Sequence, residues 1–308
     1  MDEVRAVLDA ELPGSEIESL DPVQHGNTKH TVIADLGTRS VVVQFAPYEK
    51  LRIERNLSAA VRRRTSVPTP RVLGIGRIDD RGYLVAERAP GTELHERFNA
   101  IDDATRRRIA RRFGRFLAEI HAAFRFEGYG PIELSDDGGA FVATDQREWT
   151  AWFRGYAAEG IDALPSELDS LRDRIETALA DASIPSDPDP RLYPWDLRPG
   201  NALYADGTVS AVLDWDGPLS ADPGLSVAKT EHLVAEWYTE ESLSSAFRSG
   251  YETIRPLPET PPTYRLVAVV RSAVDASGQI TRPGYPERTG EAAVAFHRDR
   301  IESILARV

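Results

Sequence analysis

The 308-residue chain lacks cysteine and is poor in lysine, because only Lys29, Lys50 and Lys229 are lysines among its 37 basic residues. The absence of cysteine excludes disulfides and thiolate metal sites. No run of about 18 apolar residues occurs, which argues against a membrane-spanning helix. The net charge of −12 argues against a broad nucleic-acid surface, which needs a basic footprint. The acidic, amphipathic N-terminus is unlike a secretory signal, so we expect a cytoplasmic protein without nucleic-acid or membrane partners.

The composition is that of a folded protein with an unusually acidic surface. Hydrophobic residues make up 41% of the chain, and its length predicts two lobes or domains. Many carboxylates with few lysines are typical of salt-accumulating organisms such as haloarchaea, although high-GC bacteria also favour arginine. The acid excess indicates a solvated surface and does not by itself imply a cationic substrate.

The most informative stretch is R-L-Y-P-W-D-L-R-P-G-N at 191–201, followed by a short hairpin that ends in D-W-D. It places Asp196 on a turn, Asn201 five residues later and Asp214 after an apolar strand. Magnesium prefers hard oxygen ligands and takes few of them from protein, so Asn201 and Asp214 are candidate metal ligands. Asp196 is then left to receive a hydroxyl proton. The alternative for the first part of this stretch is an ordinary turn before a hairpin.

The order and spacing of these residues resemble the catalytic and metal loops of eukaryotic-like kinases. The local sequence is closer to that of the aminoglycoside phosphotransferase and choline kinase-like superfamily. The usual pattern in that superfamily is H-G-D-x-x-P-x-N followed by I-D-W-E/D. The resemblance covers nearly the whole chain. It implies an α+β, protein-kinase-like bilobal fold, with a small β-rich N-lobe over 1–89 and a larger, mainly helical C-lobe over 90–308. Three departures are visible: Pro194 replaces the His that normally braces the loop, Gln44 replaces a strand lysine, and Ser226 replaces the second Asp of a D-P-x-x-D run.

The phosphate-covering loop of the superfamily corresponds to H-G-N-T-K-H at 25–30. The resemblance implies that Gly26, Asn27 and Thr28 cradle phosphate through backbone N–H groups and small polar side chains. A glycine followed by an asparagine also makes a plain turn, which stays the alternative.

Gln44 stands on the next strand, where the superfamily has the lysine that reaches the α- and β-phosphates. A neutral amide gives up a full positive charge there, and Lys29 is a candidate to supply it. Glu54 matches the helix Glu of the family and is expected to steady Gln44; an ordinary surface acid is the alternative.

The segment G-Y-L-V-A-E-R-A-P-G at 82–91 resembles the hinge that binds adenine. By that match, the Glu87 carbonyl and the Ala89 N–H read the adenine edge. The implied cofactors are ATP and Mg²⁺.

Periodicity predicts the remaining elements. Residues 2–20 are expected to form a helix broken at 13–14, residues 23–46 a hairpin, and residues 135–145 a loop. Further helices are expected at 48–64, 103–123, 147–160, 165–182, 225–238, 240–254, 262–277 and 287–307.

The resemblance implies an ATP-dependent phosphotransferase that moves the γ-phosphate to a hydroxyl of a small molecule, such as an amino-sugar, sugar, amino alcohol or aminoglycoside-like compound. Asp196 would act as the base and Arg198 would reach the γ-phosphate, a surface arginine being the alternative. A nucleotide-binding pseudokinase with a regulatory role is the rival function. The protein would be a monomer or a homodimer. The candidates for contacts with the acceptor are Trp149, Trp152, Glu231, His232, Glu236 and Trp237.

Overall fold

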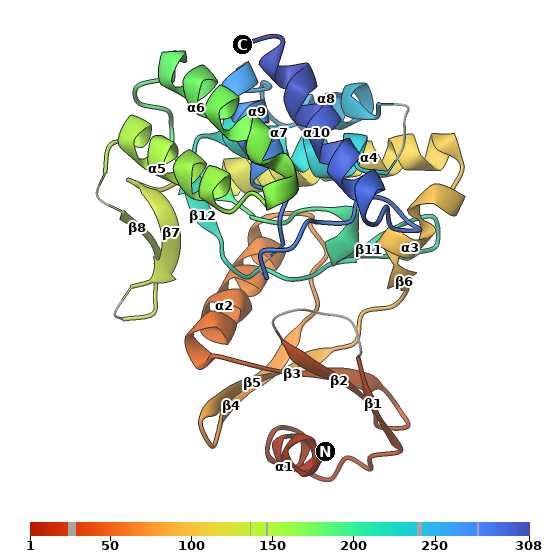
Figure 1. Cartoon of the computed structure of the whole chain (residues 1–308). Helices are drawn as coiled ribbons and strands as arrows, with labels where there is room; N and C mark the ends of the chain where they lie inside the picture. The colour runs from red at the N-terminus through yellow and green to blue at the C-terminus, as the bar shows by residue number, and fades with distance from the viewer. Residues whose placement is uncertain (24–28, 136, 146, 239–241, 276) are drawn as a thin grey trace. The chain divides into compact units, whose positions relative to one another are not determined.

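The computed structural model describes residues 1–23, 29–135, 137–145, 147–238, 242–275 and 277–308. The chain forms two compact units. One joins Met1–Thr92 to Ala202–Gly217, and the other joins Glu93–Asn201 to Pro218–Val308. Figure 1 shows that a sheet dominates the first unit and helices the second, which confirms the expected α+β class. The assignment of functions to lobes divided at residue 89 stays a prediction.

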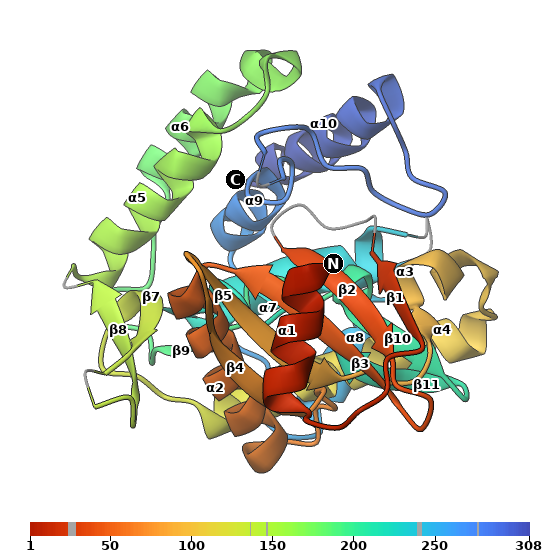
Figure 2. The same ribbon diagram turned by 90° about the horizontal axis from the view of Figure 1, so that it is seen from below.

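The first unit is built on an antiparallel sheet in the order β1-β2-β3-β5-β4. Its strands are β1 (Ser19–Pro22), β2 (His30–Asp35), β3 (Ser40–Ala46), β4 (Val72–Ile78) and β5 (Arg81–Glu87). Because side chains alternate along a strand, Val41, Val43 and Phe45 lie on one face of the sheet, where they pack with residues of α1 (Asp2–Glu11). Figure 2 shows α1 lying across this sheet. Leu84 lies on the other face, where it packs with Leu51 of α2 (Tyr48–Arg64).

The N-terminal helix is shorter than expected. It ends at Glu11, before the Pro13-Gly14 turn, and the predicted continuation to residue 20 is wrong. Residues 19–22 instead form an edge strand paired with β2, from Ser19 opposite Asp35 to Pro22 opposite Val32. The hairpin of β2 and β3 is confirmed for the described residues, and α2 has the predicted bounds.

The second segment of the first unit is a hairpin of β10 (Ala202–Ala205) and β11 (Thr208–Val212). It belongs to a sheet in the order β11-β10-β6, where β6 is Thr92–Glu93. The Val212 N–H donates to the Pro68 carbonyl at 2.7 Å. This bond fixes the strand end from which the D-W-D segment departs.

The second unit is mainly helical. Its helices are α3 (Leu94–Arg97), α4 (Asp103–Ala123), α5 (Trp149–Asp162), α6 (Arg172–Asp181), α7 (Pro223–Glu231), α8 (Ser244–Glu252), α9 (Pro262–Val270) and α10 (Glu291–Leu305). Short 3₁₀ turns occupy Phe98–Ala100, Ser166–Leu171 and Pro199–Asn201. The predicted bounds of α4 are confirmed, and Asp102 caps its start by accepting from the Thr105 N–H at 2.9 Å.

Glycines let two of these helices approach closely. A Cβ added at Gly250 of α8 would lie 1.9 Å from the Arg111 carbonyl oxygen of α4, and one at Gly114 would lie 1.9 Å from the Phe247 carbonyl oxygen. Only residues without a side chain fit at this contact.

A four-stranded sheet in the order β8-β7-β12-β9 completes the second unit. Its strands are β7 (Tyr129–Leu134), β8 (Phe141–Asp145), β9 (Arg191–Tyr193) and β12 (Leu219–Ala221). The loop predicted over 135–145 is therefore wrong in part, because its second half is a strand paired with β7. Before this strand, the Ser135 N–H donates to the Ala140 carbonyl at 2.9 Å.

Several predicted helices are shorter in the structure. The segment expected over 225–238 is α7 followed by a π-helical turn at His232–Glu236, and the segment expected over 262–277 ends at Val270. Helix ends depend on contacts that a periodic pattern does not contain.

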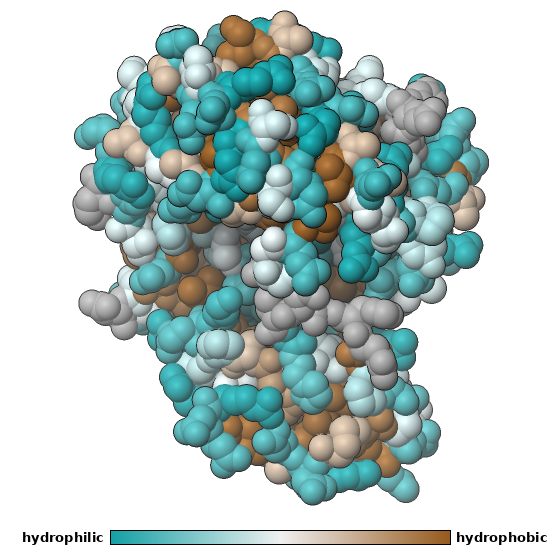
Figure 3. All heavy atoms as spheres, viewed as in Figure 1, coloured by the Kyte–Doolittle hydropathy of each residue, from teal (hydrophilic) through white to brown (hydrophobic). Residues whose placement is uncertain are grey.

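The second unit has a large aromatic and aliphatic core, in which Trp149, Phe153 and Tyr264 are fully buried. The face drawn in Figure 3 is covered largely by hydrophilic residues. None of the described helices is long and apolar enough to cross a membrane.

Candidate active site

The motif at 191–201 begins as a strand and ends as a tight turn. β9 pairs with β12, with Leu192 opposite Ser220 and Tyr193 opposite Leu219. Beyond the strand, the Leu197 N–H donates to the Pro194 carbonyl at 3.3 Å and the Asn201 N–H donates to the Arg198 carbonyl at 3.0 Å. We call residues 194–201 the catalytic loop, after the role that the resemblance implies for them. The polar side chains of this loop therefore lie just beyond the C-terminal end of β9.

Asp196 and Asn201 are joined directly within this loop. The Asn201 Nδ2 donates to the Asp196 main-chain carbonyl at 3.0 Å. This bond uses the amide nitrogen and leaves the amide oxygen for a cation or water. The Asp196 side chain is 28% exposed, so its carboxylate is accessible to a solute. The five-residue spacing thus gives a partly exposed carboxylate on a main chain that the Asn201 side chain holds.

Two basic side chains flank the Asp196 carboxylate. The Arg198 Nε lies 3.4 Å from Oδ2, and the Lys229 Nζ lies 3.9 Å from Oδ1. Arg198 was predicted as a site residue and lies beside the expected base. Lys229 was not predicted, because it reaches the loop from α7. Its rarity as one of three lysines was the one sequence feature that could have drawn attention to it.

A buried histidine near the end of α4 is linked to β9, the strand that leads into the catalytic loop. His121 contacts the Tyr251 hydroxyl through Nδ1 at 2.7 Å and the Ser226 hydroxyl through Nε2 at 3.2 Å. Arg191 and Arg255 both donate to the His121 carbonyl. Burial, with these two arginines, holds the pKa of His121 well below its ordinary value. Ser226, which replaces an Asp of the superfamily, therefore meets a neutral imidazole with a neutral hydroxyl.

Asp214, in the first unit, has an unusual backbone conformation. Its φ is 60°, in the left-handed region that few residues other than glycine adopt. The strain is smallest for Asp and Asn, and such outliers cluster at functional sites. Its side chain is 44% exposed. Nearby, Asp216 accepts from the Gly217 N–H at 2.8 Å and so caps the following turn.

The expected partner of Glu54 is wrong. The Lys29 Nζ donates to Glu54 Oε2 at 2.7 Å and to Asp214 Oδ1 at 2.6 Å. Gln44 instead donates from Nε2 to the Thr31 hydroxyl at 3.4 Å, across the β2–β3 pair. A longer, charged side chain from the loop thus takes the position next to Glu54 that the strand residue was expected to fill.

The remaining nucleotide-side predictions are only partly described. Gly26, Asn27 and Thr28 lie outside the described residues. Glu87 ends β5, where its N–H donates to the Arg71 carbonyl and its side chain accepts from Arg71 at 3.0 Å. Ala89 follows the last ladder bond, which the Arg88 N–H makes to the Ser40 carbonyl. The adenine-reading role of the Glu87 carbonyl and the Ala89 N–H stays a prediction.

Five of the six side chains considered for contacts with the acceptor are buried, and the sixth, Glu236, is partly exposed, so their role stays a prediction. Trp149, Trp152 and Trp237 are buried, and the Trp149 indole donates to the Tyr264 hydroxyl at 3.0 Å. Glu231 is fully buried and pairs with Arg248 and Arg265. The His232 Nδ1 and Glu236 Oε2 atoms lie 3.0 Å apart within the π-helical turn.

The chemistry of the predicted metal ligands fits magnesium. Asn201 offers an amide oxygen and Asp214 a carboxylate, which are hard donors of the kind that Mg²⁺ prefers. Within the described part of the chain, no three His, Cys, Asp or Glu side chains gather into a metal site. Magnesium takes few ligands from protein and the rest from phosphates and water.

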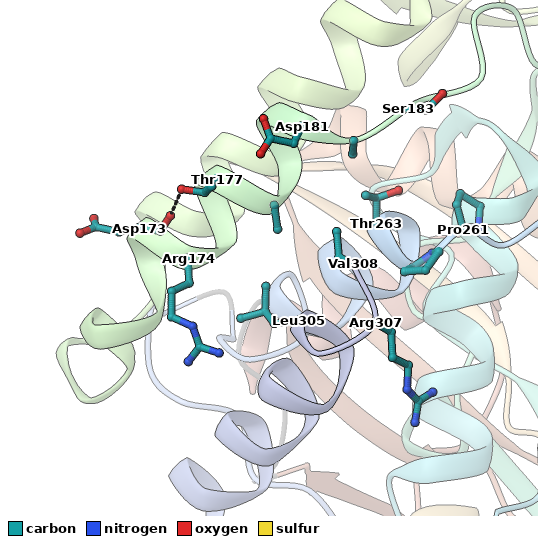
Figure 4. Close-up of a pocket in the computed structure, with 13 residues that line it drawn as sticks. Asp173, Arg174, Thr177, Asp181, Ser183, Pro261, Thr263, Leu305, Arg307 and Val308 are labelled. Carbon is teal, nitrogen blue, oxygen red and sulfur yellow. Dashed lines mark hydrogen bonds between the residues drawn. The ribbon is translucent and has the colours of Figure 1, made fainter.

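A separate pocket of about 680 Å³ lies in the second unit (Figure 4). Its lining comes from α6, the start of α9 and the C-terminal residues, with Asp173, Arg174 and Thr177 on one side and Leu305 on another. The Thr177 hydroxyl donates to the Asp173 carbonyl at 2.8 Å, so it is already used. No residue of the catalytic loop lines this pocket.

Solved structures share the fold. A thermostable mutant of aminoglycoside phosphotransferase APH(4)-Ia, in ternary complex with AMP-PNP and hygromycin B, is 17% identical, over 99% of this chain and 98% of that chain, with a TM-score of 0.65. Macrolide 2′-phosphotransferase MphH from Brachybacterium faecium is also 17% identical, over 99% and 98%, with a TM-score of 0.57. At this identity the likeness shows the protein-kinase-like fold.

Sequence comparison gives a more specific result. A search of curated protein sequences finds no match. The model of the phosphotransferase enzyme family (APH) matches residues 19–256, a span that contains the catalytic loop and the D-W-D segment. The chain therefore belongs to the phosphotransferase enzyme family.

Proposed function

We propose that the chain is an ATP-dependent kinase that transfers the γ-phosphoryl group to a hydroxyl of a small molecule. The observation that carries this proposal is the catalytic loop, in which the accessible Asp196 carboxylate stands on a main chain held by the Asn201 amide at 3.0 Å. A simple turn before a hairpin does not require an accessible carboxylate flanked by two basic side chains.

In this mechanism Asp196 accepts a hydrogen bond from the acceptor hydroxyl, orients it and takes its proton late. The transferred group passes through a loose transition state, so positioning and charge neutralisation supply most of the catalysis. Arg198, beside Asp196, donates to the γ-phosphate as a planar cation. Both groups belong to one turn, so their relative position is fixed by the main chain.

The nucleotide side follows from the family pattern and from the contacts of Lys29. Asn201 and Asp214 would hold Mg²⁺, which neutralises charge on the β- and γ-phosphates when bound. Lys29 supplies the positive charge that Gln44 lacks. Four further groups complete the proposed nucleotide site. They are Gly26, Asn27 and Thr28 of the phosphate loop, Gln44 of the strand, Glu54 of the helix, and Glu87 and Ala89 of the hinge.

The family relatives support a small-molecule acceptor without identifying it. One solved structure contains an ATP analogue and hygromycin B. For this chain, amino-sugars, sugars, amino alcohols and aminoglycoside-like compounds are all proposed acceptor classes. The test is ADP release from Mg-ATP across a panel of these compounds, at low and high salt.

The matched variants are Asp196→Asn and, as control, Asp206→Asn. Asp206 is exposed at the turn between β10 and β11. Its φ is 50°, a left-handed conformation that Asn tolerates as well as Asp does. We expect acceptor-dependent ADP release that Asp196→Asn abolishes and Asp206→Asn preserves. ATP binding without turnover on any acceptor would favour the nucleotide-binding pseudokinase instead.

A further inference from the structure

Lys229 is the one described lysine whose ammonium is buried against an aromatic ring. It lies near the end of α7, and its side chain is 2% exposed. The Nζ atom lies 3.2 Å from the centroid of the Trp195 ring and 3.9 Å from Asp196 Oδ1. One ammonium therefore contacts two consecutive residues of the catalytic loop.

This placement is costly for the fold. Lysine is rarely buried without a full ion pair, because an ammonium loses its hydration in the interior. Burial lowers the pKa of Lys229 to about 7; Asp196 opposes this shift, while Arg271 and Arg198 add to it. A well-packed apolar side chain would avoid this cost. The ammonium therefore has a task that an apolar residue would not perform.

The Trp195 ring, which the ammonium contacts, is itself held by other side chains. Its ring lies 5.9 Å from the rings of both Tyr156 and Tyr193, measured between centroids, and the Arg271 guanidinium lies 5.1 Å from it. These contacts fix the residue that precedes Asp196. Pro194, in contrast, has no side-chain donor with which to hold the loop.

We propose that Lys229 is a positioning residue, whose ammonium on the Trp195 ring sets the direction of the Asp196 carboxylate and replaces the brace that Pro194 cannot provide. The catalytic consequence rests on the proposed phosphotransfer function. Arg198 holds the other carboxylate oxygen, so the two basic side chains together restrict rotation of the Asp196 side chain. Lys229 itself, being buried, acts through Asp196 and not on the acceptor.

The contact can be tested without any acceptor, because the chain has only three lysines. Selective ¹³C labelling of lysine gives three side-chain signals, of which Lys229→Arg identifies one by its loss. We expect this signal to be shifted by the Trp195 ring and to titrate near neutral pH. Asp196→Asn should lower its titration midpoint further, since the carboxylate favours the charged amine. A midpoint unchanged by Asp196→Asn, or a shift unchanged by Trp195→Leu, would overturn the proposed contact.

The effect on catalysis is tested with Lys229→Met and Lys229→Arg. A misplaced catalytic group costs up to about 100-fold in rate, so we expect Lys229→Met to lower kcat by about 10- to 100-fold at unchanged KM for ATP. Lys229→Arg should recover part of kcat. We expect wild-type kcat to decline at high pH as Lys229 deprotonates, and we expect Lys229→Arg to lack this decline. Equal kcat and pH profiles in wild type and Lys229→Met would refute the positioning role. Absence of turnover in the wild type would refute the kinase function instead, while the lysine signals would still decide the contact.

Discussion

At the scale of single residues, the proposed nucleotide side carries its positive charge on a loop residue, Lys29, because the strand residue Gln44 is neutral. Lys29 contacts Glu54 at 2.7 Å and Asp214 at 2.6 Å. Burial alone would lower the pKa of Lys29, but the charges of Glu54 and Asp214 outweigh it and hold the pKa above its ordinary value. The ammonium therefore stays charged at neutral pH.

Lys29→Met should weaken ATP binding. Hydrogen bonds that involve a charged group contribute about 1.5–3 kcal/mol, so the dissociation constant for Mg-ATP should rise about 10- to 100-fold. Titration calorimetry measures it directly. Lys50→Met is the matched control, because Lys50 is 54% exposed and only approaches Asp216, at 3.6 Å.

Gln44→Lys should restore part of this affinity in the Lys29→Met background. Gln44 lies opposite Leu84, on the sheet face that packs against α2, the helix that carries Glu54. A lysine there can return the charge to the strand. If the double variant binds Mg-ATP no better than Lys29→Met, the missing charge is not what limits binding.

At the scale of elements, sequence reasoning succeeded where structure is local. The hydrophobic periodicity of α2 and α4 and the alternation in β2 and β3 predicted those elements. The edge strand β1 and the hairpin of β7 and β8 were missed, because a short polar strand is defined by its neighbour.

In the candidate site, too, contacts between residues close in sequence were predicted and contacts between distant segments were not. Asp196 and Asn201 are five residues apart on one turn, so their spacing was enough to bring them together. The partner of Glu54 was mistaken, because Lys29 reaches it from a loop that precedes the predicted strand. Lys229 was missed, because α7 meets the catalytic loop only through tertiary packing. Contacts between distant segments are what a periodic pattern omits.

Close packing of α4 and α8 leads to a stability prediction. Gly250→Ala would put a methyl group 1.9 Å from the Arg111 carbonyl oxygen, so the two helices must separate. Overpacking of this kind typically costs about 1–3 kcal/mol in the free energy of unfolding. Urea unfolding measures the loss. Gly128→Ala is the control, because its added Cβ would meet nothing closer than 3.5 Å; equal stability of both variants would contradict the tight contact.

At the scale of the whole molecule, the buried Lys229 makes stability depend on pH. Its pKa is about 7 in the folded chain and 10.5 ordinarily, so the unfolded chain binds more protons between these values. Stability contributed by this group therefore rises as pH increases from about 7 toward 10.5.

Lys229→Met should remove this dependence. We expect the variant to exceed the wild type in free energy of unfolding by at least about 1 kcal/mol at pH 7, with a smaller difference at pH 9, because one pKa unit corresponds to about 1.4 kcal/mol. Urea unfolding at both pH values measures the difference. A difference that is the same at pH 7 and pH 9 would show that the amine is not desolvated in the fold.

The most direct test of the central claim follows the phosphoryl group itself. Wild-type protein, Asp196→Asn and Asp206→Asn are each mixed with γ-³²P-labelled Mg-ATP and the acceptor panel, and the label is traced in one turnover. We expect the label on an acceptor hydroxyl with the wild type and with Asp206→Asn, and its retention on ATP with Asp196→Asn. Transfer that continues undiminished in Asp196→Asn, or release of the label only as free phosphate in the wild type, would contradict the account.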